Sequence, residues 1–450
     1  MRKLAMLLVV ACLVTVSAVA GQFDWKQQSG KSVSVLFVQH PYAEGIIGKI
    51  PEFEAATGIK VNYSVIPEEN YFDKLTTMLS SRSGDPDVFM TGAYQVWEYS
   101  PPGYMADLDK FIKDPSKTNP DYDFSDFFPG IVGALKWDRV PGHKIGTGPQ
   151  WALPVGFETN CLTYNKEILD SKGFKAPASI DELIKTATAL NKFEGEGTYG
   201  LAVRGTRNWA TIHPAFMTTY SNYGAVDLAI ENGKIVSKVN SKESVEMTEM
   251  WVKLVQAAGS PTWASYTWYQ CGADLGARKA AILFDADSLG FFTNFPGASD
   301  QAGKLAYAPP PLPAGKSKIN ANLWVWSIAM NASSKIQDAA WIFIQWFTDK
   351  PYQTFSVVDW KAVDPPRKSV FENPKFQEKI KSYEGFGDMF TRTVDGTTIQ
   401  FTPNPYFFEL TTEWAATLQD LVAGKYSSTQ TALDELKVKM DNALADIDLE

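Results

Sequence analysis

The amino-acid sequence predicts an α/β fold divided into two lobes, and three observations support this. The chain has 450 residues and a mass of 49.8 kDa, more than one hydrophobic core usually organises. It is 45% hydrophobic and 21% charged, which is the composition of a globular protein rather than of a disordered or polytopic membrane chain. Between residues 31 and 90, strand and helix patterns alternate, which is typical of an α/β sheet.

The first lobe begins with a β-rich run that stops at Pro41, since proline cannot continue a strand ladder. A helix pattern closed by Gly58 and a clean alternating strand follow. The predicted elements are a strand at 31–38, a helix at 43–57, a strand at 59–66, a helix at 71–81, a turn at 84–86 and a strand at 87–90. Ligands of such sheets bind at the carboxyl ends of the strands, where Gln39, His40 and the loop 91–97 lie.

The rest of the chain repeats this mixture of strands and helices. Residues 113–150 are rich in Pro, Gly, Asp and aromatic residues and are predicted to be irregular. The C-terminal segment is predicted to be an amphipathic helix, because its apolar residues recur at helical spacing. The predicted elements are strands at 152–155 and 162–164, helices at 180–191, 241–258 and 272–280, strands at 281–284 and 322–330, and helices at 335–348 and 428–449.

The N-terminus has the pattern of a secretory leader. Arg2 and Lys3 precede an apolar stretch at 4–16, and small residues at 17–20 permit cleavage before Gly21. An alternative is a lipoprotein signal at 9–12, in which Cys12 would carry the lipid. We favour a cleaved leader and a periplasmic location, because the apolar run continues after Cys12.

Charge and cysteine content exclude further classes. A net charge of −9 argues against a nucleic-acid partner. Cys161 and Cys271 remain after cleavage, and we expect two buried thiols, with a disulfide between them as the alternative in an oxidising compartment.

Catalytic and metal-binding motifs are missing. The chain has three histidines and lacks the GxSxG, HExxH and GxxxxGK[ST] motifs. We therefore expect no enzyme activity, no metal and no cofactor. Because the chain has 51 acidic residues, a secreted glycoside hydrolase that uses two carboxylates stays an alternative.

Aromatic residues are abundant, with 14 Trp, 18 Tyr and 27 Phe. Sugar rings bind flat aromatic faces, with carboxylate, amide and arginine side chains at the rim. Arg204 and Trp209 place a bidentate donor close to such a platform. Five tryptophans lie in polar or loop contexts: Trp97, Trp209, Trp263, Trp268 and Trp360. Together they favour a carbohydrate-like ligand.

Several segments, in this order, resemble the family 1 extracellular solute-binding proteins of bacterial ABC importers, the maltodextrin-binding-like group. They are 84–88 (GDPDV), 162–169 (LTYNKEIL) with Gly173, Pro177 and 180–183 (IDEL), 278–281 (RKAA), 324–330 (WVWSIAM) with the helix at 338–349, and the helix at 429–441. Within the family, residues 204–205, 285–287 (DAD) and 366–369 (PRKS) most resemble the binders of sugar alcohols and monosaccharides.

The resemblance implies a two-lobed periplasmic-binding-protein fold, in which each lobe is a mixed sheet flanked by helices and crossing segments form a hinge. Its N-terminal lobe would comprise 21–155 and 327–360, and its C-terminal lobe 156–326 and 361–450. It implies a monomer that closes on a sugar or sugar alcohol and delivers it to ABC permease subunits. The long segment 113–150 departs from the family pattern.

The resemblance also suggests ligand-binding residues. These are Gln39, His40 and Tyr94 at strand ends of the first lobe, Glu158 after the first crossing, Arg204 and Trp209 in a loop of the second lobe, Asp287 after a strand of that lobe, and Trp324 and Trp360 by the other crossings. A binder of an amino acid or polyamine stays an alternative, since Arg204 with Asp287 would suit a zwitterion.

Overall fold

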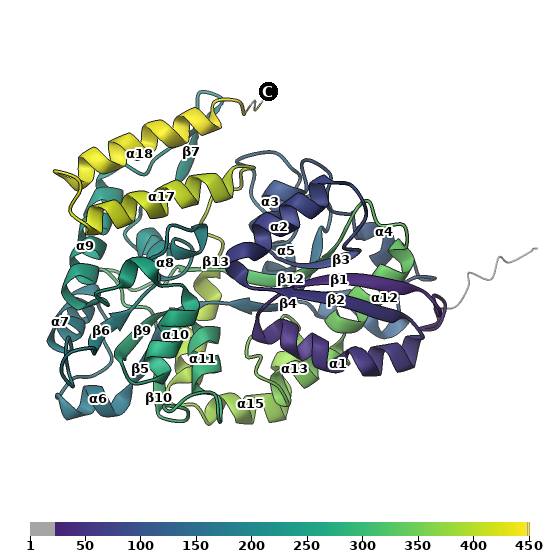
Figure 1. Cartoon of the computed structure of the whole chain (residues 1–450), viewed down its shortest axis with the longest axis horizontal. Coiled ribbons are helices and arrows are strands. Elements are labelled where there is room, and N and C mark those ends of the chain that lie inside the picture. The colour runs from purple at the N-terminus through teal and green to yellow at the C-terminus, as the bar shows by residue number, and fades with distance from the viewer. Residues whose placement is uncertain (1–22, 448, 450) are drawn as a thin grey trace, which may run out of the picture.

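The computed structural model describes residues 23–447 and 449. The predicted leader at 1–20 and Cys12 lie outside the described residues. The predicted mixed α/β architecture is confirmed, with two main sheets side by side (Figure 1).

The first sheet has five strands in the order β2-β1-β3-β12-β4. β1 pairs in parallel with β2 and β3, and β12 is antiparallel to β3 and β4. Its strands are β1 (Ser32–Val38), β2 (Lys60–Ile66), β3 (Val88–Gly92), β4 (Ala152–Glu158) and β12 (Trp324–Met330). Because β12 is antiparallel, its first residues lie at the edge where the other strands of this sheet end. Trp324 is accordingly opposite Glu158 in the register.

The second sheet has four strands in the order β10-β5-β9-β6. β5 is antiparallel to both its neighbours, and β6 is parallel to β9. These strands are β5 (Asn160–Asn165), β6 (Tyr199–Ala202), β9 (Ala280–Ala286) and β10 (Leu305–Ala308). Two small pairs complete the strands, namely β7 (Leu228–Glu231) with β8 (Lys234–Ser237) and β11 (Ala321–Asn322) with β13 (Thr397–Thr398).

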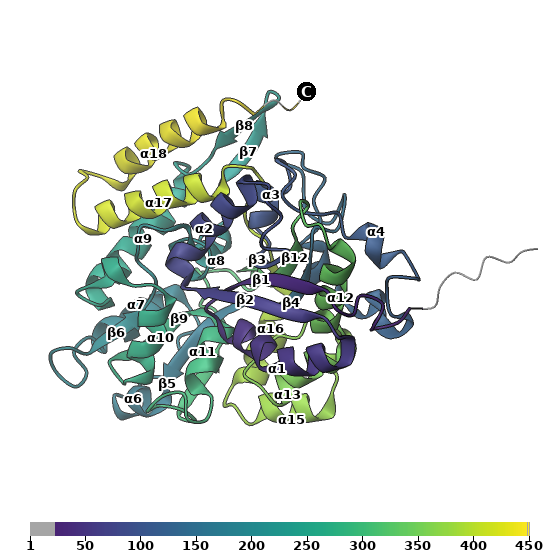
Figure 2. The same cartoon turned by 45° about the vertical axis from the view of Figure 1, so that its right-hand side comes forward.

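Helices flank both sheets. Around the first sheet are α1 (Pro41–Thr57), α2 (Glu68–Ser80), α3 (Gln95–Tyr99), α4 (Asp109–Ile112), α5 (Pro129–Gly133), α12 (Gln337–Thr348), α13 (Lys350–Val358) and α14 (Lys368–Phe371). Around the second are α6 (Lys166–Ser171), α7 (Ile180–Ala189), α8 (Ala215–Asn222), α9 (Lys242–Ala258), α10 (Trp268–Gly276), α11 (Asp287–Asn294), α15 (Pro374–Lys381), α16 (Phe386–Thr393), α17 (Phe407–Val422) and α18 (Thr429–Leu444). In both views α1 and α13 lie below the first sheet, α2 and α3 lie above it, and α17 and α18 lie above the second (Figures 1 and 2).

Local signals explain where the elements begin and end. His40 caps α1 by accepting a hydrogen bond from the Tyr42 N–H, and Gly58, with φ of 72°, ends that helix. The predicted helix at 272–280 is wrong in register: α10 begins at Trp268, because Thr267 and Gln270 form a capping box there, and the chain is extended again from Ala280.

Segments far apart in sequence meet between the two sheets. The chain passes directly from β4 to β5, and from β11 to β12. Further on, the Phe128 N–H donates to the Pro366 carbonyl, and Ser369 donates to Asp126, so residues 366–369 lie against the segment at 120–128. This segment was predicted to be irregular, but it forms two short 3-10 helices, Pro120–Tyr122 and Phe124–Asp126. The residue boundaries of the two lobes stay a prediction.

Cys161 and Cys271 are both free and buried, as predicted. Among the described residues, no helix is long and apolar enough to cross a membrane. One GxGxxG spacing, which is typical of dinucleotide-binding loops, occurs at 195–200. It leads into β6 and does not connect a strand to a helix, so it lacks the structural context of a dinucleotide-binding loop.

Candidate ligand-binding site

A cavity lies between the two sheets, where the strands of both sheets end. Its lining comprises His40, Glu68, Glu158, Arg204, Trp209, His213, Trp268, Ala286, Ser288, Leu289, Phe292, Trp324 and Trp326. It contains about 320 Å³ of space between its lining atoms, of which only about 20 Å³ is open to the centre of a water molecule. Both sheets contribute residues, so the cavity is formed only when the two halves of the molecule are in contact.

Arg204 is the central cation of this cavity. It follows β6, and its guanidinium forms a bidentate pair with Asp285 of the parallel neighbour β9, with an Nε to Oδ2 distance of 2.9 Å and an Nη2 to Oδ1 distance of 2.6 Å. Nη1 donates to His213 Nε2 at 3.1 Å and to the Ala210 carbonyl at 3.3 Å. A guanidinium has five N–H groups, and these contacts use four of them, which leaves one on Nη2 for a ligand.

The loop that carries Arg204 is fixed by a tryptophan. Trp263 Nε1 donates to the Arg204 carbonyl at 3.0 Å. The next residue must be Gly205, since a Cβ there would lie 2.2 Å from the Trp263 carbonyl oxygen.

Both buried histidines are neutral. Burial, together with the nearby Arg204 charge, lowers the pKa of His40 to about 3 and holds the pKa of His213 well below its usual value. His40 Nδ1 accepts the Tyr42 N–H at 3.2 Å, so its proton is on Nε2, 4.0 Å from Glu158 Oε1. His213 Nε2 accepts from Arg204 and its proton is on Nδ1. His40 therefore offers the cavity a donor without a charge.

Glu158 lies at the end of β4 opposite Trp324, and its Oε1 accepts a hydrogen bond from Trp326 Nε1 at 2.9 Å. Burial raises the pKa of Glu158 to about 7, against the opposing effect of Arg204. Glu68, at the start of α2, is the second carboxyl of the cavity, and burial raises its pKa as well.

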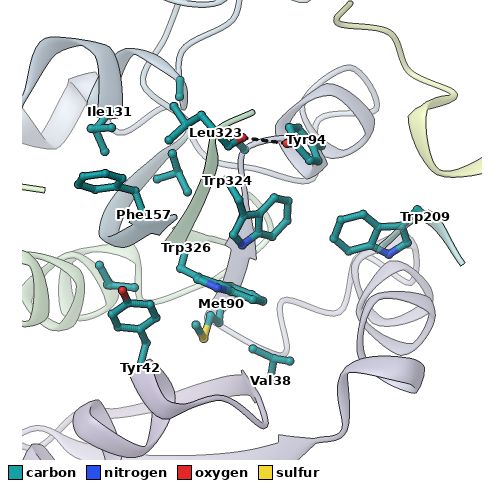
Figure 3. Close-up of a cluster of buried hydrophobic side chains, with 14 of the residues drawn as sticks. Val38, Tyr42, Met90, Tyr94, Ile131, Phe157, Trp209, Leu323, Trp324 and Trp326 are labelled. Atoms are coloured by element: carbon teal, nitrogen blue, oxygen red, sulfur yellow. Dashed lines mark hydrogen bonds between the residues drawn. The ribbon is translucent and has the colours of Figure 1, made fainter. Parts of the chain in front are cut away.

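Aromatic rings form the walls. Trp324 and Trp326 point to the same face of β12, with centroids 5.1 Å apart, and Trp209 approaches them from the second lobe at 5.2 Å from Trp324 (Figure 3). Trp209 also stacks on His213 at 5.3 Å. A Cβ at position 92 would lie 2.0 Å from the Trp324 ring, so Gly92 in β3 leaves room for this indole.

Of the nine residues predicted for the site, five line the cavity: His40, Glu158, Arg204, Trp209 and Trp324. Four lie elsewhere. Gln39 is exposed, and its carbonyl accepts from the Tyr269 hydroxyl. Tyr94 lies behind Trp324 and donates to the Leu323 carbonyl at 2.8 Å (Figure 3). Ligand contact by any of the nine stays a prediction.

The remaining two belong to the framework of the site. Asp287 accepts the backbone N–H groups of Thr159 and Ser288, which joins the crossing after β4 to α11. Trp360 Nε1 donates to the Pro41 carbonyl, beside α1. The alternative of a zwitterion site built from Arg204 and Asp287 is not favoured by this geometry, because Asp285 pairs with the guanidinium and Asp287 does not line the cavity.

Sequence reasoning missed Glu68, His213, Ser288, Leu289, Phe292 and Trp326 as lining residues, and named Trp268 only as one of five tryptophans in polar contexts. Of those five, Trp97 and Trp263 are buried in packing. No cluster of three or more His, Cys, Asp or Glu side chains suited to a metal ion occurs within the described ranges.

Comparison with known proteins decides the family. Residues 40–354 match the model of the bacterial extracellular solute-binding proteins. The chain belongs to this family. The chain is 41% identical over 410 residues to an erythritol/L-threitol-binding protein of Mycolicibacterium smegmatis. This alignment covers 91% of this chain and 85% of the relative. A mannitol-binding protein of Pseudomonas aeruginosa is 24% identical over 301 residues, in an alignment that covers 66% of this chain and 64% of that protein.

Solved structures of solute-binding proteins share the fold. One from Agrobacterium radiobacter, in complex with ribitol, has a TM-score of 0.79 at 21% identity and covers 92% of this chain and 99% of that chain. One from Agrobacterium vitis, with bound D-mannitol, has a TM-score of 0.78 at 22% identity. The superposition covers 92% of this chain and 98% of that chain. The predicted two-lobed periplasmic-binding-protein fold is thereby confirmed.

The raised pKa of Glu158 predicts a pH-dependent stability. A carboxyl whose pKa rises from 4.5 to about 7 on folding stabilises the fold fully below pH 4.5, and this contribution is lost as the pH rises through 7. We expect the difference in free energy of unfolding between wild type and Glu158→Gln to change by about 3 kcal/mol over that range. Urea unfolding from pH 4.5 to 8 measures it, with the exposed Glu167→Gln as control. Parallel profiles for wild type and Glu158→Gln would contradict the assignment.

Proposed function

We propose that this solute receptor of an ABC importer binds a short sugar alcohol, with a four-carbon polyol as its cargo. Receptors of this kind bind a sugar or sugar alcohol between the lobes and deliver it to a membrane permease. The observation that carries the proposal is a small cavity that offers both donors and acceptors between aromatic walls. The 41% identity to an erythritol/L-threitol-binding protein supports it.

The chemistry of the cavity suits an uncharged polyol. A polyol carries a hydroxyl on every carbon, and each hydroxyl both donates and accepts. The cavity offers donors on His40 Nε2 and Arg204 Nη2, and acceptors on Glu158 and Glu68. The C–H faces of the chain would pack on Trp209 and Trp324.

An amino-acid ligand fits less well. A zwitterion needs a fixed cation for its carboxylate, and here Asp285 already occupies the guanidinium of Arg204 in a bidentate pair. Glu68 and Glu158 would also face that carboxylate.

Binding would close the molecule. The hydrogen bonds that join the proposed lobes include those from Trp268 Nε1 to Glu68, from the Tyr269 hydroxyl to the Gln39 carbonyl, and from the Phe408 N–H to Glu98. A ligand stabilises this closed form only by the contacts that it gains there from both lobes.

The remaining parts of the proposal concern its setting. Residues 1–20 would direct export and be removed, which would place the receptor in the periplasm. The receptor would act as a monomer and would have no catalytic activity. The N-terminal lobe would comprise 21–155 and 327–360, and the C-terminal lobe the rest of the mature chain. Its partners would be the permease subunits of the importer.

A thermal-shift screen of residues 21–450 tests the proposal, with erythritol, L-threitol, ribitol, mannitol, glycine and putrescine as ligands. A ligand that binds only the folded state adds about 2.7 kcal/mol of stability at 100 times its Kd. We expect the tetritols to give the largest shift and to be recovered chemically unchanged. A shift with glycine or putrescine alone would indicate another solute class, and consumption of the polyol would indicate an enzyme.

A further inference from the structure

A second chamber lies beside the ligand cavity. It is lined by Glu68, Glu69, Arg204, Thr206, Asn208, Ala210, Thr267, Trp268 and Tyr269. It contains about 440 Å³ of space between its lining atoms, of which about 80 Å³ is open to the centre of a water molecule. The two chambers share three lining residues, Glu68, Arg204 and Trp268, which therefore separate them.

The wall between the chambers is built from both lobes. Trp268 is the first residue of α10, and Glu68 is the first residue of α2. The Trp268 indole Nε1 donates a hydrogen bond to Glu68 Oε2 at 2.5 Å. Arg204 lies beside this pair and is held by Asp285. The wall thus exists in the closed form, when the two lobes meet.

Trp268 is held in place from several sides. Its ring stacks on Tyr269 at 3.8 Å, and the Tyr269 hydroxyl donates to the Gln39 carbonyl at 2.8 Å. The ring also lies 5.6 Å from His40. The capping box of Thr267 and Gln270 fixes the backbone at the start of α10, from which the indole extends.

The second chamber is chemically able to bind hydroxyl groups. Thr206, Thr267 and Tyr269 carry hydroxyls, Asn208 carries an amide, and Glu69 carries a carboxylate. A polyol longer than the first cavity would find donors and acceptors there if the partition were absent.

We propose that the Glu68–Trp268 pair sets the maximum length of the ligand, by closing the polyol cavity against a neighbouring chamber that would otherwise accept further carbons. This inference rests on the proposed function, since it assigns the residues that select a short polyol over a long one. A residue that rejects longer ligands sterically lowers the affinity for mannitol and leaves the affinity for erythritol nearly unchanged. The ratio of the two affinities therefore reports its effect.

The test is the ratio of dissociation constants for mannitol and erythritol, measured by titration calorimetry. We expect wild type to prefer erythritol by about 100-fold or more. Trp268→Ala should lower this ratio at least tenfold, chiefly by tightening mannitol binding. Trp268→Phe keeps a ring in the wall and should retain most of the preference. Glu68→Ala removes the other half of the wall, at a partly buried position, and tests the same point if Trp268→Ala fails to fold. It should also lower the ratio, even though it removes an acceptor from the cavity.

The outcomes separate this inference from the proposed function. A wild-type ratio in the alanine variants, or no preference in wild type, overturns the length assignment and leaves a polyol receptor. Failure of wild type to bind any polyol overturns the proposed function and the length assignment with it.

Discussion

Replacing Arg204 by methionine is expected to abolish polyol binding and to cost about 3–5 kcal/mol of stability, because a buried charge loses its partner. The Asp285 side chain has no exposed surface, and both of its oxygens accept from the guanidinium; apart from it, Oδ1 also accepts the Ala286 N–H. The variant also removes the second Nη2 N–H, which we propose donates to the ligand. Urea unfolding and erythritol titration measure the two losses.

A double variant separates stability from binding. In Arg204→Met with Asp285→Asn, both charges are gone, so we expect much of the stability to return while binding stays absent. Arg204→Lys keeps the charge but not the two-pronged geometry, and we expect binding weakened at least tenfold. Binding restored in the double variant would contradict a direct role of Arg204.

Trp324→Ala is expected to cost about 3–5 kcal/mol, the usual loss for a buried aromatic residue, and to weaken polyol binding at least 100-fold. Trp324 contacts Tyr94 at 4.9 Å, Trp209 at 5.2 Å and Trp326 at 5.1 Å between ring centroids, and it lines the cavity. Its loss therefore removes a wall of the cavity and support for two other walls.

Trp341 in α12 is the matched control. It is also fully buried, stacks on Phe111 and donates to the Lys117 carbonyl, but it does not line the cavity. Trp341→Ala should lose similar stability while the folded fraction binds erythritol like wild type. Equal affinities for the two variants would contradict the role assigned to Trp324.

Local patterns were sufficient for much of the fold. The alternation of strand and helix up to residue 90 depends on short-range periodicity and on caps such as Gly58, which sequence shows directly. The same logic found His40, because it follows a strand at the ligand edge, whereas Glu158 was suggested by the family resemblance.

Long-range pairing limited the prediction of the site. Arg204 and Asp285 are 81 positions apart and meet only because β6 and β9 are neighbours. Glu68 resembled an ordinary surface acid, since the helix containing it was predicted to begin at residue 71. Trp326 could have been found, because residues two apart in a strand share a face and Trp324 had already been chosen.

On the proposed function, a short polyol binds inside the cavity, with groups from both lobes on its hydroxyls. A crystal structure of the protein with erythritol tests this most directly. We expect one polyol between Trp209 and Trp324, with hydroxyls within hydrogen-bond distance of Glu158 and Arg204. An empty cavity at saturating erythritol, or erythritol bound only at the surface, would contradict the account.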